Sequence, residues 1–372
     1  MKITITRADL AEAARAVKGL VARDRLSVFS RVRIDASGCL SVTGSNGEVQ
    51  VEWRAGRKIA EAGTASVSGE AFAAFAGALP DGNAEIGDCA AGKIMLRCGG
   101  VKFKLAKCGV EGFAAMTGPK EAARGAVHID AGDLREMLRK VKFAMSADAT
   151  RADLCGVNIE LKDGLLGMTA TDGRRLAHVE CRPRDAGNAP GTAVTLPAKT
   201  VAVLYGLLER MGEGDVYMVF DSSAAQITGD KWSMTAKAFA GGYPNWRGVI
   251  PKAGSLNHTI RLDRRLFVEA IGRTALASDE SSGVEILLDR GRCVFAAKNY
   301  ITITAAEAEM PVADMDDIKC KFCVNPRLLR DALEAIDDDE FLLHTDCGTV
   351  TPLMLTCSAP WKAVVMPYRK EG

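Results

Sequence analysis

The segment Ile129-Asp-Ala-Gly-Asp-Leu134 has two counterparts in this chain, Ile5-Thr-Arg-Ala-Asp-Leu10 and Leu262-Asp-Arg-Arg-Leu-Phe267. Each reads as the end of a β-strand, a polar turn with an aspartate and the first apolar residue of a helix. The last residues of the three segments are separated by 124 and 133 positions. Apolar residues then continue at positions i, i+4 and i+7, imperfectly in the third copy, which predicts one helix after each segment.

Two further sets of segments repeat with nearly the same spacing. Alternating strands end in an Asx residue at Asn46, Asp172 and Asn299, and strand-to-helix turns lie at Val67–Phe72, Leu196–Val201 and Val324–Leu329. Three signals that share one period indicate three copies of one fold. We therefore predict three domains, at residues 1–123, 124–251 and 252–372.

Each copy is also doubled internally, because a strand, a helix and a run of alternating strands are followed by the same order again. In the middle copy, the second half reads as a strand at Thr192–Leu196, a helix from Pro197 to about Met211 and strands within 215–236. Two helices per domain, packed on sheets that make up most of the mass, predict an α+β fold.

Composition places the 372-residue chain among globular proteins, with 48% hydrophobic and 26% charged residues. No apolar stretch is long enough to span a bilayer, and the N-terminus lacks the apolar core of a signal peptide. The 11 cysteines are an odd number without disulfide-framework spacing, so we expect a reduced, cytoplasmic protein. The net charge of +1 means that any contact with nucleic acid must come from locally clustered basic residues.

One cysteine pair has the spacing of a metal site. Cys320-Lys-Phe-Cys323 is followed by His344 and Cys347, a set that could bind zinc. The segment alternates like a strand, however, which would turn residues three apart to opposite faces. We therefore predict strand cysteines and no metal.

No catalytic motif is recognisable. The sequence has no phosphate-binding loop, no G-x-S-x-G nucleophile elbow and no H-E-x-x-H metal motif. We predict a protein without a cofactor that is not an enzyme. An enzyme with an unrecognised site stays the least favoured alternative.

Basic residues gather on two of the predicted repeat helices. In the middle copy Arg135, Arg139 and Lys142 form a row at i, i+4 and i+7, with Lys140 on the other flank. The first copy has Arg15 and Lys18 at corresponding positions, and the third copy does not share the row. A single row of this kind is usually a solvated face. Its recurrence makes it a candidate surface for nucleic acid phosphates.

Three motifs add a resemblance to a known family. They are Ala170-Thr-Asp-Gly-Arg-Arg-Leu-Ala177, Tyr243-Pro-Asn-Trp-Arg247 with the following Val249-Ile-Pro251, and the C-terminal Val364-Val-Met-Pro-Tyr-Arg369. In this order, and in a chain with a threefold repeat of about 125 residues, they resemble the bacterial β sliding clamp family, the processivity subunit of DNA polymerase III. The resemblance covers the whole chain.

The resemblance implies a function and a set of partners. Members of the family close head-to-tail as a homodimer into a ring that encircles duplex DNA without reading its sequence. They tether the replicative polymerase, the clamp loader and repair proteins, which carry short clamp-binding peptides. The residues expected to form the peptide-binding cleft are Leu154, Thr171, Gly173, Arg174, Arg175, Leu176, Pro244, Val249, Asn325, Val364, Val365, Met366, Pro367, Tyr368 and Arg369.

Some positions differ from the family pattern. Leu328 stands where the family usually has an aromatic residue near the cleft, and Gly248 stands where some members carry a second basic residue. These differences bear on the choice of partner more than on the fold.

The resemblance also sets the expected dimer seam. It would join an edge strand around Phe103 and Leu105 in the first domain to the region of Ile271–Leu276 in the third. The competing functional hypothesis is a divergent paralogue that keeps the fold and the cleft but acts as an adapter or decoy and does not encircle DNA.

Overall fold

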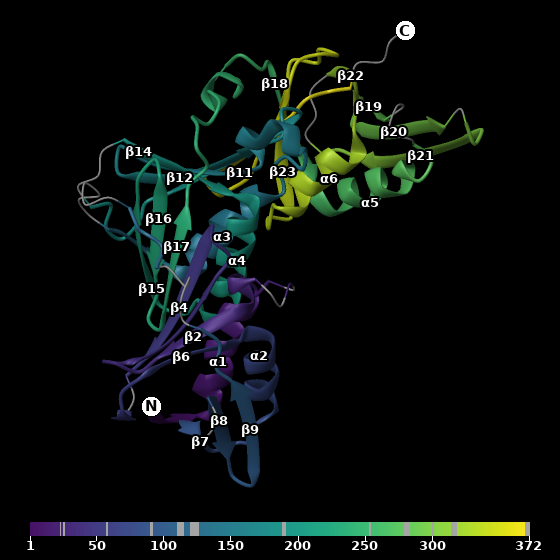
Figure 1. Ribbon diagram of the computed structural model, residues 1–372. Helices are drawn as coiled ribbons and strands as arrows, with labels where there is room; N and C mark the ends of the chain where they lie inside the picture. Colours follow the sequence, from purple (N-terminus) through teal and green to yellow (C-terminus); the bar gives the residue numbers. More distant parts are fainter. Residues whose placement is uncertain are drawn as a thin grey trace. The chain divides into compact units, whose positions relative to one another are not determined.

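The computed structural model describes residues 1–22, 24, 27–56, 59–89, 92–109, 115–119, 126–187, 191–252, 254–278, 283–299, 301–313 and 318–368 (Figure 1). The chain forms two compact units. The first contains Met1–Arg135 and Pro183–Ala240, and the second contains Glu136–Arg182 and Gly241–Gly372. Each unit is described by itself.

The first unit consists of three complete helices and the strands around them. Its α-helices are α1 (Arg7–Lys18), α2 (Gly69–Ala78) and α4 (Ala198–Met211), and a 3₁₀ turn lies at Val28–Ser30. Its strands are β1 (Lys2–Thr6), β2 (Arg31–Asp35), β3 (Leu40–Ser45), β4 (Val49–Ala55), β5 (Ile59–Glu61), β6 (Thr64–Ser68), β7 (Asn83–Cys89), β8 (Lys93–Cys98), β9 (Val101–Ala106), β10 (Val127–Asp130), β14 (Thr192–Pro197), β15 (Asp215–Phe220), β16 (Ala224–Thr228) and β17 (Trp232–Lys237).

Two antiparallel sheets organise the first unit. One has the strand order β5-β1-β7-β8-β9, and the other has the order β10-β15-β16-β17-β4-β3-β2-β6. The pairing of β4 with β17, with Trp53 opposite Trp232, joins strands of the predicted first and second domains into one sheet. Helices α1 and α2 lie side by side (Figure 1).

The second unit has the same types of element. Helix α3 (Ala131–Lys142) contains the boundary between the units, and α5 (Arg264–Ala275) and α6 (Pro326–Glu334) follow, with 3₁₀ segments at Ala149–Leu154 and Trp246–Gly248. The strands are β11 (Gly156–Lys162), β12 (Leu165–Thr171), β13 (Arg175–Cys181), β18 (His258–Asp263), β19 (Val284–Asp289), β20 (Arg292–Asn299), β21 (Thr304–Pro311), β22 (Lys319–Val324), β23 (Glu340–Thr345), β24 (Leu353–Thr356) and β25 (Trp361–Val365).

Strands of two predicted domains again share one sheet in the second unit. Its strands run in the order β11-β12-β13-β25-β24-β23-β18, so that β13 of the middle copy pairs with β25 of the last. A second sheet has the order β21-β20-β19-β22. Phe267 of α5 packs edge-on against Phe295 and Phe341, which are fully buried.

The repeated segments form the strand-to-helix turns that the sequence predicts. The Thr6 hydroxyl accepts a hydrogen bond from the backbone N–H of Asp9 at the start of α1, and Asp263 accepts one from Leu266 at the start of α5. In the middle copy Asp130 accepts from Gly132. These side chains satisfy backbone donors that the first helical turn leaves unpaired, which fixes each helix start.

The α+β fold class is confirmed, with two α-helices in each predicted domain among the described residues. The exact domain bounds stay a prediction. The predicted strand around Cys320 and Cys323 is β22. Burial raises the pKa of the Cys320 thiol to about 12, which disfavours the thiolate that zinc binds. Within the described residues, no helix is long and apolar enough to cross a membrane.

Candidate functional site

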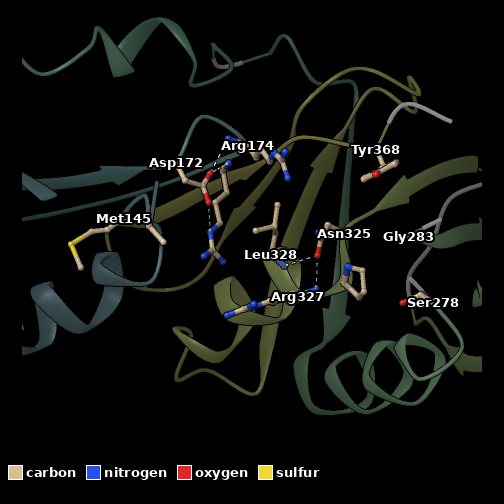
Figure 2. A pocket seen from close by; sticks show the side chains of 12 residues that line it. Met145, Asp172, Arg174, Ser278, Gly283, Asn325, Arg327, Leu328 and Tyr368 are labelled. Carbon is tan, nitrogen blue, oxygen red and sulfur yellow. Dashed lines mark hydrogen bonds and ion pairs between the residues drawn. The ribbon is translucent and has the colours of Figure 1, made fainter. Parts of the chain in front are cut away.

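A cavity of about 760 Å³ lies in the second unit. Residues from the β12–β13 turn, the start of α6 and the C-terminal segment line it, and Figure 2 shows Asp172 and Arg174 from the turn together with Asn325, Arg327 and Leu328 from the start of α6. Both segments lie in motifs that the sequence analysis identified.

The β12–β13 turn has a conformation that its own residues determine. Asp172 Oδ1 accepts hydrogen bonds from the backbone N–H groups of Arg174 and Arg175, at 2.8 and 2.9 Å. Gly173 has φ +84°, and a Cβ there would lie 2.5 Å from Nη1 of Arg151. Glycine is therefore required at this position by conformation and by space. The turn places the side chain of Arg174 at the cavity.

Arg175 is held by two carboxylates beneath the turn. Its Nε lies 3.1 Å from Asp172 Oδ2, and its Nη1 lies 2.7 Å from Asp331 Oδ2 on α6. The side chain is only 10% exposed, and its guanidinium lies 5.3 Å from the centre of the Phe143 ring. The charge of Arg175 is thus already balanced inside the protein, and the side chain joins the turn to α6.

The C-terminal segment after β25 connects two parts of the second unit. The backbone N–H of Met366 donates to the carbonyl of Arg174 at 2.9 Å, and that of Tyr368 donates to the carbonyl of Cys323 at 2.6 Å. Pro367 between them is buried. Backbone bonds to the turn and to β22 thereby fix Tyr368 at the cavity.

Asn325 caps helix α6 next to the cavity. Its Oδ1 accepts hydrogen bonds from the N–H groups of Arg327 and Leu328, at 3.0 and 3.4 Å, and Pro326 occupies the first helical turn. Proline is suited to this position because it lacks the N–H that would stay unpaired there. The cap fixes where α6 begins and directs its first turn to the cavity.

A hydrophobic cluster contains other residues of the predicted cleft. Leu176, Trp246 and Val364 are buried together, with Tyr243, Ile250 and Met354 packed against them. Leu176 and Val364 are cross-strand partners on β13 and β25. The three motifs therefore meet in the second unit, as the sequence analysis implies.

The predicted cleft residues have different environments. Arg174, Arg175, Asn325 and Tyr368 line the cavity. Leu154, Leu176, Val364, Val365 and Pro367 are buried, Thr171 and Gly173 belong to the turn, and Pro244, Val249 and Met366 are exposed without lining the cavity. Arg369 lies outside the described residues. Whether the buried and exposed members contact a peptide stays a prediction.

The cavity has further lining residues that were not among the predicted site residues. They are Met145, Ala147, Asp172, Ser278, Gly283, Pro326, Arg327 and Leu328. Asp172, Pro326 and Arg327 are sequence neighbours of predicted residues and could have been found from that adjacency. Met145, Ala147, Ser278 and Gly283 follow helices or precede a strand, and only the tertiary structure brings them to the cavity.

Leu176→Ala is expected to lower the free energy of unfolding by about 2–5 kcal/mol, because it leaves a void in a packed cluster. Leu176 is 1% exposed and packs with Trp246 and Val364. Thermal melting and peptide affinity should be measured on the same samples. Leu328→Ala is the matched control, because Leu328 is half-buried at the cavity and should lose peptide affinity with little change in melting. Unchanged melting of Leu176→Ala would contradict the packing described above.

His178 makes the stability of this cluster dependent on pH. It is 1% exposed, stacks on Trp246 and lies 2.8 Å from both Thr169 Oγ1 and Glu180 Oε1. Burial lowers the pKa of His178 below its ordinary value of 6.5, although Glu180 opposes the shift. The unfolded chain then binds more protons below pH 6.5, so the free energy of unfolding should decrease as the pH falls from 7.5 to 5.5. His178→Gln should flatten this slope in denaturant titrations, and an equal slope would contradict the assignment.

Comparisons with known proteins place this geometry in a family. A family model described as the N-terminal domain of the DNA polymerase III beta subunit matches residues 1–117, and one for its central domain matches residues 128–245. The beta sliding clamp of Caulobacter vibrioides is 28% identical and covers 99% of this chain and 100% of its own. That of Streptomyces coelicolor is 27% identical over the full length of both.

The chain belongs to the bacterial β sliding clamp family.

Solved structures agree over the full length. The DNA polymerase III subunit beta from Pseudomonas aeruginosa superimposes with a TM-score of 0.91 and 26% identity, with 100% of both chains covered. The sliding clamp of Bacillus subtilis, at 20% identity and a TM-score of 0.90, shares the fold. The family resemblance seen in the sequence is thereby confirmed.

Within this clamp-family chain, the predicted DNA-facing residues divide into two groups. Arg15 and Lys18 on α1 and Arg135 on α3 are exposed. Arg139, by contrast, forms ion pairs with Glu136 and Asp337, and Lys140 is 8% exposed beside the same two carboxylates. The prediction that Lys140 lies on an open surface is wrong, because the loop after α6 covers this end of α3. Lys142 is half-buried and has an interaction partner.

The predicted seam residues also require correction. Strand β9 is an edge strand, as predicted, but Phe103 stacks on Phe75 at 4.4 Å and Leu105 is 4% exposed. Ile271 is completely buried within its own unit and is not available to a partner. Leu276, just after α5, is 88% exposed. The alternation on β9 thus serves the core on one face and solvent on the other.

Proposed function

We propose that this protein is a DNA sliding clamp in which two copies close head-to-tail into a ring around duplex DNA. Each copy then holds a short peptide of the replicative polymerase, the clamp loader or a repair protein in the cavity between the β12–β13 turn and α6. The observation that carries the proposal is this cavity, built from all three motif regions, in a chain similar to named sliding clamps over its full length.

Contact with DNA is proposed to involve phosphates only. The exposed basic residues are Arg15, Lys18 and Arg135, and the net charge of the chain is +1. Few free cations in a nearly neutral protein favour weak, sequence-independent contacts that permit sliding. Retention on DNA then depends on the closed ring rather than on affinity.

The seam between the two copies is proposed to pair β9 of one with β21 of the other. Both are edge strands in the described sheets, with unpaired backbone groups that another strand can use. Lys102 and Lys104 are exposed on β9, and Glu307 and Glu309 are exposed on β21. The opposite charges favour this pairing over the contact at Ile271 that the sequence analysis expected.

A peptide is a suitable occupant of the cavity for two reasons. The lining combines apolar side chains such as Leu328 and Met145 with hydrogen-bonding groups, as peptide-recognition sites do. In addition, the sliding clamp of Pseudomonas aeruginosa, 26% identical to this chain, has been crystallised bound to griselimycin. We further propose that the protein works in the cytoplasm, where its 11 free cysteines stay reduced.

The experiment that tests this function is the release of the protein when a circular DNA to which it has been loaded is linearised. A ring slides off the new ends, whereas an adapter or decoy that does not encircle DNA gives the same binding to both forms. Sedimentation should give about 79 kDa for a dimer, twice the chain mass of 39.5 kDa. A monomer that binds peptides but is never retained on circles would support the adapter alternative.

A further inference from the structure

Two cationic side chains at the cavity have no partner in the protein. Arg174 from the β12–β13 turn and Arg327 from the first turn of α6 are both exposed and both line the cavity (Figure 2). In the described part of the chain, neither guanidinium forms an ion pair or a hydrogen bond. This contrasts with Arg175, whose charge Asp172 and Asp331 balance.

The carboxylate at the cavity is already fully used. Asp172 is the only acidic residue among the described residues that line the cavity. Its Oδ1 accepts two backbone N–H groups and its Oδ2 is bonded to Arg175. Turning Asp172 toward Arg174 or Arg327 would break the turn. The lining therefore presents an excess of positive charge to whatever occupies it.

The start of α6 does not offer a competing anion site. Asn325 already accepts the hydrogen bonds of the N–H groups of Arg327 and Leu328. An anionic group in the cavity would therefore be recognised by the guanidinium groups, which bind carboxylates in a bidentate geometry. Leu328 and Met145 provide apolar surface in the same cavity.

We propose that the cavity selects acidic peptides, in which an aspartate or glutamate between apolar anchors pairs with Arg327 and Arg174. This rests on the proposed function, because it specifies the class of peptide that the cavity takes. Arg327 is the specificity-determining residue: it follows the Asn325 cap directly and approaches the cavity from α6, opposite the turn that carries Arg174.

The test compares two fluorescein-labelled peptides, Gln-Leu-Asp-Leu-Leu and Gln-Leu-Asn-Leu-Leu, by fluorescence anisotropy. At 50 mM salt the acidic peptide should bind about tenfold more tightly than the amide peptide, as expected for charge-assisted hydrogen bonds in a partly open site. At 500 mM salt the ratio should shrink, since partly exposed charges are screened. Arg327→Gln should reduce the ratio to about twofold.

Arg330→Gln is the matched control on the same helix. Arg330 is exposed, pairs with Glu334 and does not line the cavity, so its loss should leave the ratio unchanged. Arg327→Glu should reverse the preference toward a peptide with lysine at the variable position. Thermal melting should be unchanged in all three variants, because both side chains are exposed.

The outcomes separate the inference from the function on which it rests. Equal affinity for the acidic and amide peptides, or an unchanged ratio in Arg327→Gln, would overturn the acidic preference while leaving peptide binding intact. Failure of both peptides to bind the unmodified protein would overturn both proposals.

Discussion

Replacing Lys102 and Lys104 with glutamate is expected to convert the dimer into monomers of 39.5 kDa. The two side chains are exposed on the β9 edge, and the proposed partner strand β21 presents Glu307 and Glu309. The substitution replaces attraction with repulsion along the strand pair, so the dimer should weaken about 100-fold, or roughly 3 kcal/mol. Sedimentation equilibrium over a concentration series measures this change directly.

Two controls identify the seam. Combining this variant with Glu307→Lys and Glu309→Lys should restore the dimer, because the charges are then exchanged rather than lost. Reversing Lys2 and Lys93 gives the same change in charge on β1 and β8 of the same sheet, but away from its β9 edge, and should leave the dimer intact. An intact dimer in the first variant would place the seam elsewhere. A charge at Leu105 is less informative, since that side chain is in the core.

Linearising a loaded circular DNA is expected to release nearly all of the protein at moderate salt. The proposed ring is retained by topology, and only Arg15, Lys18 and Arg135 of the predicted basic residues are exposed without carboxylate partners. Gel filtration of nicked circles before and after cutting by a restriction enzyme separates bound from free protein. Equal retention on linear and circular DNA would show ordinary electrostatic binding instead.

The contribution of phosphate contacts can be measured on the same samples. Reversing Arg15, Lys18 and Arg135 should shorten residence on circles and reduce the salt dependence of loading by about three units of logarithmic slope, near one for each lost contact. Reversing Arg139 is unsuitable as a probe, because it would place a third carboxylate against Glu136 and Asp337 and destabilise the second unit. A triple variant with unchanged salt dependence would show that these residues do not contact phosphates.

Much of the fold could be predicted from the sequence because its signals are local. The caps at Thr6, Asp263 and Asn325 involve side chains that bond to backbone groups two or three residues away. The turn at Asp172 and Gly173 is similarly local, since both its hydrogen bonds and its positive φ are set within four residues. The threefold period then repeats these local signals, so each copy supports the interpretation of the others.

The candidate site was only partly predictable for the same reason. The turn and the Asn325 cap come from recognisable motifs, and they bring Arg174, Asn325 and Tyr368 to the cavity. Ser278 and Gly283 have no local signal that distinguishes them from other residues at the ends of elements. Arg327 lies in a recognised segment, yet its exposure and lack of a partner depend on which carboxylates the fold brings near it.

The sequence by itself determined the three repeated copies, the strand-to-helix turns and the family, because each depends on residues close together in the chain or on the order of motifs. Only the tertiary structure decided which charges are free. Arg139 pairs with Asp337, 198 positions away, and Arg175 pairs with Asp331, 156 positions away. The energy of an ion pair depends on the distance and burial of both groups, and packing across the sheets sets these quantities.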